Sequence, residues 1–419
     1  MLSYHHARAD APSNERRAVV TGVGAVSGWG WGAGVLWDGL ASGRSVIGPF
    51  TRFDASAHRT RVAAEVPPAP PALAARLAAL RHASRADMYA LAAAWDALHA
   101  AGLPAVLERD DAGVFFGSST GGFWESEEFF AGLIAPRRVP VRTSLLGSQQ
   151  SNGPGDAVAR ALATGGPALT ISSACASGTL ALGAALDAVR SGEVTLAIAG
   201  GADSLCQLTH GGFNALRSVD ETACRPFQKD RQGLSIGEGA GVLVLEERGH
   251  ALARGARPLA ELLGCGASCD AQHMTAPDPT GTGPSRAIEA ALADAGTAKD
   301  AIVFVNAHGT GTPLNDAAEW AALQLVFGAR AGEIPVTSTK GVVGHLLGSA
   351  GAIEAVATVL CLVHGAVHPT PGGGPVDPQA AVRLVLERPL PIRPGAAVST
   401  SLAFGGSNAA AVFGAAEGA

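Results

Sequence analysis

Short apolar runs of strand length alternate with longer runs of helical periodicity along most of this chain. The strand-like runs include residues 113–117, 195–201, 241–245 and 302–306. Between the first two of these, apolar residues recur at helical spacing over residues 180–189. Strands that alternate with helices predict an α/β fold, in which a largely parallel or mixed sheet carries helices on its faces.

The same pattern starts again near Pro258, with a strand-like run at 259–265 and helical runs at 285–295 and 319–327. We therefore expect a polar tail at 1–17, a first half at 18–257 and a similarly built second half at 258–419. With 419 residues, 47% of them hydrophobic, each half can bury a core of its own. The proline- and glycine-rich residues 369–375 predict a surface loop.

Bulk composition excludes several classes of function. A formal net charge of −6 gives no overall cationic field for nucleic acid. The six cysteines are scattered without the rhythm of a disulfide scaffold, which indicates a reducing, cytoplasmic setting. Cys265 and Cys269 lack a second ligand pair, so we expect no metal. Residues 352–363 are apolar but too short to span a bilayer, so we expect a core helix and no membrane partner.

A glycine-containing turn, Gly22 and Gly24, follows the strand-like residues 18–21 and resembles the turn of a dinucleotide-binding unit. The spacing differs from G-x-G-x-x-G, and no acidic residue follows at the expected distance. A nicotinamide site is therefore a weak alternative.

Cys175 lies where residues 167–171, which we expect to form a short buried strand, give way to the helical run of 180–189. Unpaired amide donors at a helix start favour thiolate over thiol, so this position predicts a nucleophile. A buried structural cysteine is the alternative reading when the residue is considered alone.

Three further motifs carry polar or flexible residues beyond strand ends. His308 follows the strand-like 302–306 in a Gly/Thr loop, and His345 lies in a glycine-rich segment that begins with Lys340. Ligand crevices in open α/β sheets form at strand ends. The Phe404-Gly405-Gly406 turn allows close backbone approach and can aim an amide at a developing oxyanion. Each motif alone also fits a solvated loop, a surface lysine or a tight hairpin.

Together, Cys175, His308, Lys340, His345 and the Phe404 turn resemble the β-ketoacyl-acyl-carrier-protein synthases of the thiolase superfamily. The resemblance extends from residues 19–22 through 224–227, 237–241 and 273–275 to 404–408. It implies two related βαβαβ halves in a five-layer αβαβα sandwich that forms dimers through sheet edges. It also implies decarboxylative condensation of an acyl thioester with malonyl-acyl-carrier protein, in fatty-acid or type II polyketide or polyene synthesis.

The resemblance also assigns roles to single residues. Cys175 would carry the acyl group, and backbone amides of Cys175 and Phe404 would hold the oxyanion. His308 and His345 would donate to the malonyl thioester oxygen. Lys340 and Glu354 would form an ion pair that tunes the electric field around His345. Thr310 and Thr312 would bind the pantetheine amides, and Gly405 would also contact the substrate. Phe404 would gate the pocket.

The implied partners are an acyl carrier protein and a second subunit, either another copy or a chain-length factor. No cofactor of the enzyme's own is implied, because phosphopantetheine arrives on the carrier protein. Arg85, Arg137, Arg138 and Arg217 match basic docking residues by position, although scattered surface arginines are equally compatible.

Some residues depart from the housekeeping fatty-acid pattern, namely Gln228, Ala403 and the dimer-facing stretch 149–151. These departures leave acyl chain length and pathway open. A non-catalytic chain-length subunit of the same fold would lack Cys175. The paired histidines favour decarboxylative condensation over thiolase chemistry, which usually employs a second cysteine. A synthase of the superfamily that uses coenzyme A thioesters remains an alternative.

Overall fold

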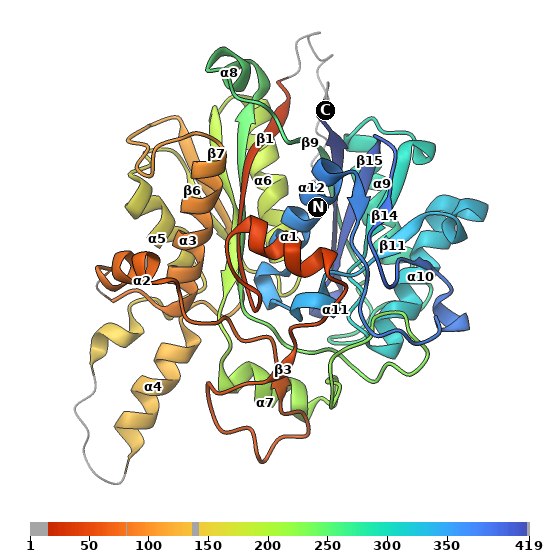
Figure 1. The fold of residues 1–419 in the computed structure, drawn as a ribbon, viewed down its shortest axis with the longest axis horizontal. Coiled ribbons are helices and arrows are strands. Elements are labelled where there is room, and N and C mark those ends of the chain that lie inside the picture. The colour runs from red at the N-terminus through yellow and green to blue at the C-terminus, as the bar shows by residue number, and fades with distance from the viewer. Residues whose placement is uncertain (1–15, 81, 136–141, 417–419) are drawn as a thin grey trace, which may run out of the picture.

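The computed structural model of the protein describes residues 16–80, 82–135 and 142–416 (Figure 1). Its strands are β1 (Ala18–Ser27), β2 (Gly30–Trp31), β3 (Gly48–Pro49), β4 (Val62–Ala63), β5 (Ala112–Gly117), β6 (Ala168–Ile171), β7 (Leu196–Asp203), β8 (Gly239–Glu247), β9 (Ala260–Cys269), β10 (Ile302–Asn306), β11 (Pro335–Thr337), β12 (Ala366–Val367), β13 (Arg383–Leu384), β14 (Leu390–Pro391), β15 (Ala396–Leu402) and β16 (Ser407–Ala415). Its α-helices are α1 (Ala33–Ala41), α2 (Pro71–Ala78), α3 (Arg85–Ala100), α4 (Phe123–Ile134), α5 (Gly153–Leu162), α6 (Ser177–Ser191), α7 (Gln207–Ala215), α8 (Arg248–Ala253), α9 (Thr282–Asp294), α10 (Pro313–Phe327), α11 (Lys340–Val343) and α12 (Ala350–His364).

Twelve strands of the described residues join into one mixed sheet, in the order β13-β11-β10-β15-β16-β9-β1-β8-β7-β5-β6 with β2 against β1. The order repeats from the centre outward, because β1-β8-β7-β5-β6 corresponds to β9-β16-β15-β10-β11. The directions repeat as well, since β5 is parallel to β6 and β7, and β10 is parallel to β11 and β15. The two units meet where β1 pairs antiparallel with β9.

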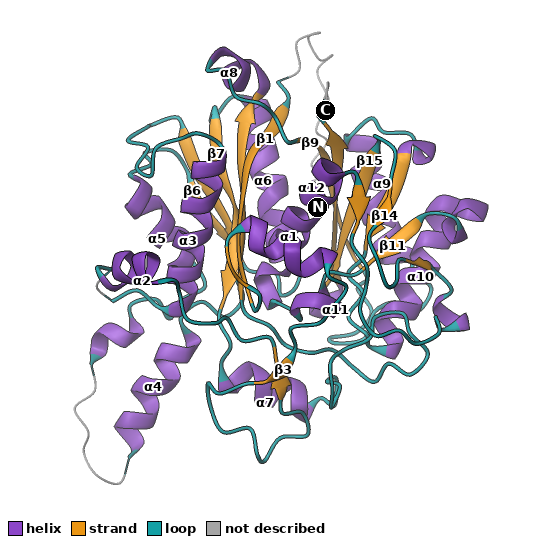
Figure 2. Ribbon diagram, in the orientation of Figure 1, coloured by secondary structure: helices purple, strands orange, loops and turns teal. Residues whose placement is uncertain are grey.

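Helices α6 and α12 lie between the two units, where α6 contacts β5 and β7 of one and β9 and β16 of the other. Helices α3 and α5 cover the outer face of the first unit, and α9 and α10 lie outside the second (Figure 2). The expected α/β class and the layered thiolase-like arrangement are therefore confirmed.

The glycines of β1 serve helix packing rather than nucleotide binding. A Cβ atom on Gly22 would lie 2.1 Å from the carbonyl oxygen of Ala97, and one on Gly24 would lie 2.0 Å from that of Ala93. Both carbonyls belong to α3, so the backbone of β1 approaches this helix more closely than any side chain would allow. The space that a dinucleotide would need is filled.

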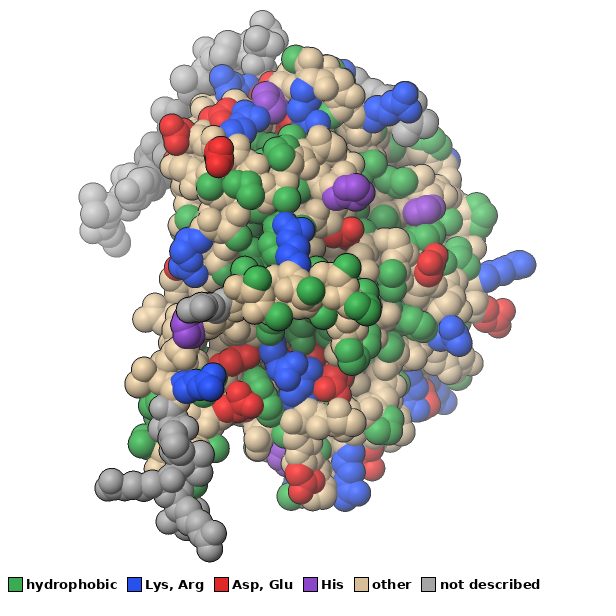
Figure 3. Space-filling model, turned by 60° about the vertical axis from the view of Figure 1, so that its left-hand side comes forward, with side chains coloured by type: hydrophobic (Ala, Val, Ile, Leu, Met, Phe, Trp, Pro, Cys, Tyr) green, Lys and Arg blue, Asp and Glu red, His purple; other side chains and the backbone are tan. Residues whose placement is uncertain are grey.

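Strand β6 was expected to be buried, and this prediction is wrong. It forms one edge of the sheet, and Ala168 and Leu169 are exposed. Helix α4 projects from the same side of the molecule and exposes Phe130, Leu133 and Ile134. Figure 3 shows this side, where hydrophobic side chains lie between scattered charged ones.

The most apolar helix is a core element. Residues Leu347–His364 are long and apolar enough in composition to cross a membrane, but 83% of this stretch is buried inside the protein. The buried face packs against β8 and β15, as expected for a core helix. The loop predicted at 369–375 is on the surface only in part, because Pro369, Thr370 and Pro371 are buried.

Candidate active site

Cys175 lies in the short turn between β6 and α6. The preceding residue, Ala174, has a φ of 45°, a left-handed conformation that is uncommon for a residue with a Cβ atom. Two hydroxyls hold the Ala174 carbonyl oxygen: Ser177 Oγ donates to it at 2.6 Å and Ser119 Oγ at 3.1 Å. The turn thereby directs the Cys175 side chain, which is 7% exposed, toward the second half of the chain.

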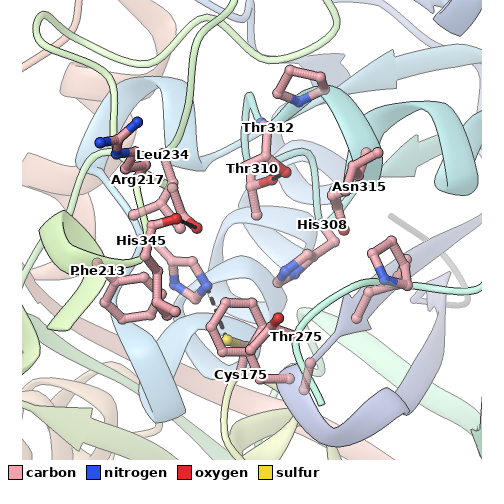
Figure 4. A pocket seen from close by; sticks show the side chains of 18 of the residues that line it. Cys175, Phe213, Arg217, Leu234, Thr275, His308, Thr310, Thr312, Asn315 and His345 are labelled. Atoms are coloured by element: carbon pink, nitrogen blue, oxygen red, sulfur yellow. Dashed lines mark hydrogen bonds between the residues drawn. The ribbon is translucent and has the colours of Figure 1, made fainter. Parts of the chain in front are cut away.

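His345 approaches the nucleophile directly. Its Nε2 lies 3.1 Å from Cys175 Sγ, and its Nδ1 accepts a hydrogen bond from the backbone N–H of Leu347 at 3.0 Å. Since an imidazole nitrogen that accepts a hydrogen bond carries no proton, the neutral ring bears its proton on Nε2. His345 therefore presents a donor to the sulfur and to anything bound beside it (Figure 4).

His308 carries its proton on the same nitrogen as His345, but a different partner holds it in this form. Lys340 Nζ lies 3.0 Å from His308 Nδ1, so the ammonium donates to Nδ1 and the ring proton belongs on Nε2. The two imidazole rings are nearly perpendicular, with centroids 5.4 Å apart. The sulfur and one nitrogen of each ring lie within 4.8 Å of one another.

This spacing also resembles that of a metal site, but the positions of the imidazole protons on His308 and His345 disfavour a bound metal ion. Metal binding requires a nitrogen lone pair directed at the ion. The Nδ1 atoms of both rings accept hydrogen bonds, which leaves N–H groups on the nitrogens that face the centre. Two converging N–H donors suit a negatively charged oxygen rather than a cation.

Burial governs the protonation of all three groups. It lowers the pKa of both His308 and His345 well below the usual range, and the charge of Lys340 lowers both further, so the rings are neutral near pH 7. It raises the pKa of the Cys175 thiol to about 11, although Lys340 and the backbone N–H of Phe404 act in the opposite direction. The expectation that the helix start favours a resting thiolate is therefore wrong for the free site, because burial outweighs the backbone donors.

The Phe404 turn closes the other side of the sulfur. The backbone amides of Phe404 and Cys175 both favour the ionised sulfur, so they face the position where an oxyanion would form. The centroid of the Phe404 ring lies 5.6 Å from that of the Phe213 ring on α7. The amide of Gly405, which has a φ of 84°, donates to the Met274 carbonyl at 2.7 Å, so it is not free for a substrate.

A cavity of about 280 Å³ leads to the sulfur. Its walls include Thr310 and Thr312, whose hydroxyls are 2.9 Å apart, together with Asn315. Leu314 lines its outer part and is exposed. A narrow passage with hydroxyl and amide groups along one wall suits an extended chain that carries amides.

Lys340 and Glu354 form the expected ion pair, with side chains that are 1% and 0% exposed. Burial raises the pKa of Glu354 to about 7 despite the lysine, and Glu354 Oε2 has no hydrogen-bond partner among the residues that the structure describes. The sequence reading linked Lys340 to His345, whereas its direct histidine neighbour is His308.

The proposed docking arginines are placed unequally. Arg217 is exposed and lines the cavity that leads to Cys175. Arg85 is half-exposed at the start of α3 and lines a separate groove with Trp31 and Tyr89. Arg137 and Arg138 lie outside the described residues.

Two buried carboxylates were not identified from the sequence. Glu319 accepts hydrogen bonds from the backbone N–H groups of His308 and Gly309, both at 2.8 Å. Asp203 accepts from the backbone of the turn after β5 and from Gly348 N at 2.7 Å. The sequence held a signal for both residues: Glu319 lies in a largely apolar helix, and Asp203 ends an apolar strand. A carboxylate buried in such a place requires several hydrogen-bond donors.

Comparison with known proteins gives consistent matches along the chain. Residues 15–251 match the model of the beta-ketoacyl synthase N-terminal domain, and residues 259–373 match that of the C-terminal domain. The 3-oxoacyl-[acyl-carrier-protein] synthase 2 of Synechocystis sp. is 37% identical over 413 residues, which cover 95% of this chain and 98% of the relative.

Solved structures match equally well. The ishigamide ketosynthase/chain length factor has a TM-score of 0.90 and 37% identity, covering 96% of this chain and 100% of that one. A type II polyketide synthase acyl-carrier protein in complex with its ketosynthase bound to the hexaketide has a TM-score of 0.87 and 28% identity, with the same coverage.

Proposed function

This chain belongs to the beta-ketoacyl synthase family, and on that premise we propose that it lengthens an acyl chain held on Cys175 by one malonyl-derived unit. The observation that carries the proposal is the convergence of Cys175 Sγ with the two imidazoles of His308 and His345. It is an acyltransferase of the condensing type.

The first half-reaction loads the enzyme. The sulfur of Cys175 attacks the carbonyl carbon of an acyl thioester, and the tetrahedral oxyanion accepts hydrogen bonds from the amides of Cys175 and Phe404. The pantetheine sulfur then leaves and takes up the proton that the thiol lost. Because the free thiol has a pKa of about 11, ionisation is coupled to arrival of the substrate, with the Nε2–H of His345 donating to the developing thiolate.

The second half-reaction uses both imidazoles as donors. Malonyl thioester loses carbon dioxide, and the electron pair of the broken bond becomes an enolate whose oxygen accepts from His308 and His345. Removal of one such donor typically costs about 2.7–4 kcal/mol of transition-state stabilisation. The enolate carbon attacks the acyl carbonyl on Cys175, a carbon–carbon bond forms, and the sulfur leaves and is protonated again.

An acyl carrier protein is the proposed bearer of both substrates, so the enzyme needs no cofactor of its own. Arg217 at the cavity rim offers a positive charge to an acidic carrier, and the hydroxyls of Thr310 and Thr312 face the path of the pantetheine amides. The solved relative in complex with its acyl-carrier protein supports this partner.

The second proposed partner is another chain of the same fold. Within the described part of the chain, β6 pairs only with β5, so its outer edge has unpaired backbone groups, and exposed Leu169 lies on this strand. Phe130 and Leu133 of α4 add apolar surface. The partner is another copy or a chain-length factor of the kind named for the ishigamide relative. The proposed compartment is the cytoplasm, because the six cysteines do not follow the rhythm of a disulfide scaffold.

Intact-protein mass spectrometry tests the proposal. Incubation with an acyl-carrier protein should add one acyl group to the wild type and to Cys269→Ser, which lacks an exposed thiol, and none to Cys175→Ala. Addition of malonyl-carrier protein should discharge the adduct and release carbon dioxide. Acylation of Cys175→Ala to the wild-type level would refute the assignment.

A further inference from the structure

The chain that leaves β12 runs beneath the active site instead of over the surface. His368 is 0% exposed and Thr370 is 1% exposed. Thr370 Oγ1 accepts from the backbone N–H of Ser338 at 2.9 Å, and Ser338 Oγ donates to the Gly309 carbonyl at 2.7 Å. This segment therefore contacts the residues just before Lys340, and through Ser338 it is linked to the loop that carries His308.

The side chain of His368 has a defined partner on each nitrogen. Its Nδ1 lies 3.0 Å from the carbonyl oxygen of Pro369, which can only accept, so Nδ1 carries the proton. Its Nε2 is then an acceptor, and the hydroxyl of Thr339 lies 3.2 Å away. Burial lowers the pKa of His368 to about 4, so the ring keeps this neutral form near pH 7.

Thr339 passes the contact on to the strand that precedes His308. Thr339 Oγ1 accepts from Asn306 Nδ2 at 3.0 Å. Two acceptors lie within reach of its one hydroxyl proton, Asn306 Oδ1 at 3.1 Å and His368 Nε2 at 3.2 Å. Asn306 Nδ2 also lies 3.0 Å from the carbonyl oxygen of Glu354. A chain of polar contacts thus links Asn306, Thr339, His368 and Pro369 in that order.

The members of this chain adjoin the residues that hold the reaction centre. Thr339 immediately precedes Lys340, and Asn306 ends β10 just before His308. Lys340 must keep its ammonium 3.0 Å from His308 Nδ1 to hold that ring with its proton on Nε2. A shift of β10 relative to α11 would lengthen this contact and turn the donor away from the enolate oxygen.

We propose that His368 is a positioning residue, which through Thr339 and Asn306 fixes the spacing between His308 and the Lys340–Glu354 pair. It touches neither the substrate nor the reacting atoms. The inference rests on the proposed role of His308 in decarboxylation. Loss of a merely structural histidine would impair both half-reactions. Loss of His368 should instead slow malonyl decarboxylation and spare the acylation of Cys175.

The test compares His368→Leu, which removes the acceptor, with His368→Gln, which can present an oxygen to Thr339. The kcat of malonyl-carrier decarboxylation should fall about tenfold in His368→Leu, with KM unchanged, since the buried Thr339 hydroxyl loses the contact that ties it to His368. The rate of Cys175 acylation should stay within about twofold of the wild type. His368→Gln should recover most of the lost kcat, and His364→Leu, an exposed histidine of α12, serves as the matched control.

A second pair of variants covers the case in which His368→Leu does not fold. Thr339→Val should lower decarboxylation as His368→Leu does, Thr339→Ser should not, and the effects of the two losses should not add in the double variant. A decarboxylation kcat near the wild-type value in His368→Leu or Thr339→Val would overturn the proposal, as would an equal loss of acylation. Wild-type enzyme that releases no carbon dioxide would instead refute the proposed function.

Discussion

Replacement of Lys340 by methionine tests the buried ion pair on which the position of His308 depends. Lys340 is 1% exposed and Glu354 is 0% exposed, so water does not reach the carboxylate that the variant leaves behind. Removal of one partner of a buried pair typically costs about 3–5 kcal/mol, because the other charge loses its compensation. Lys340→Met should be destabilised by about this amount near pH 8.

The cost should depend on pH in a direction that follows from Glu354. Burial raises the pKa of Glu354 to about 7, and Lys340 works against that rise. Without the lysine, the pKa of Glu354 in the folded protein is higher still. When the pKa of a carboxyl group is higher in the folded protein than in the unfolded chain, the folded state loses stability as the pH rises from the unfolded pKa to the folded pKa. The loss is about 1.4 kcal/mol per pH unit and stops above the folded pKa. The contribution of Glu354 should therefore level off above about pH 7 in the wild type and continue to fall in Lys340→Met.

Urea unfolding at one protein concentration, from about pH 6 to about pH 9, measures both effects. The double variant Lys340→Met/Glu354→Gln is the control, because it has no carboxyl group to titrate and should regain most of the lost stability. Parallel pH curves for Lys340→Met and the wild type above pH 7, or a double variant no more stable than Lys340→Met, would refute the reasoning.

Three further predictions concern the reaction. His308→Ala should lose about 100- to 1,000-fold in malonyl decarboxylation and still acylate Cys175, as carbon dioxide release and protein mass will show; equal loss of both would contradict the separate roles. Alkylation of Cys175 by iodoacetamide should accelerate about tenfold per pH unit between about pH 6 and pH 9 without a plateau, because its pKa is raised; a plateau in this range would indicate a resting thiolate. Arg217→Glu should raise KM for carrier-bound substrate and leave a small-molecule thioester unaffected; unchanged carrier kinetics would exclude Arg217 from docking.

The alternation of strands and helices was sufficient to predict the α/β class and the positions of β1 and of β5 to β10. It could not predict the exposure of β6, because a short apolar run has the same pattern in the middle of a sheet and at its edge. Burial of Pro369 and Thr370 was also missed. Proline- and glycine-rich segments are usually solvated, but here the polar groups of Thr370 bond to neighbouring backbone: Thr370 Oγ1 accepts from the N–H of Ser338, and the N–H of Thr370 donates to the Val385 carbonyl.

The site residues were found from motifs, but their electrostatics required the fold. The helix start after Cys175 indicates a lowered thiol pKa, whereas the structure adds burial, which has the larger effect. The partner of Lys340 among the histidines could not be chosen from sequence distance, since His308 lies in the loop after β10 and His345 in the segment after α11. Glu319 lies one strand-to-helix connection beyond His308, and only the fold brings its carboxylate to the His308 amide.

Transfer of a labelled acyl group tests the central claim most directly. Wild-type enzyme is loaded with a ¹³C-labelled acyl chain, freed of donor, and mixed with unlabelled malonyl-carrier protein. The label should leave Cys175 and be recovered on the carrier protein as a β-ketoacyl chain that is longer by one malonyl-derived unit. Label that stays on Cys175, or that is released as the free acid while carbon dioxide is formed, would contradict the account.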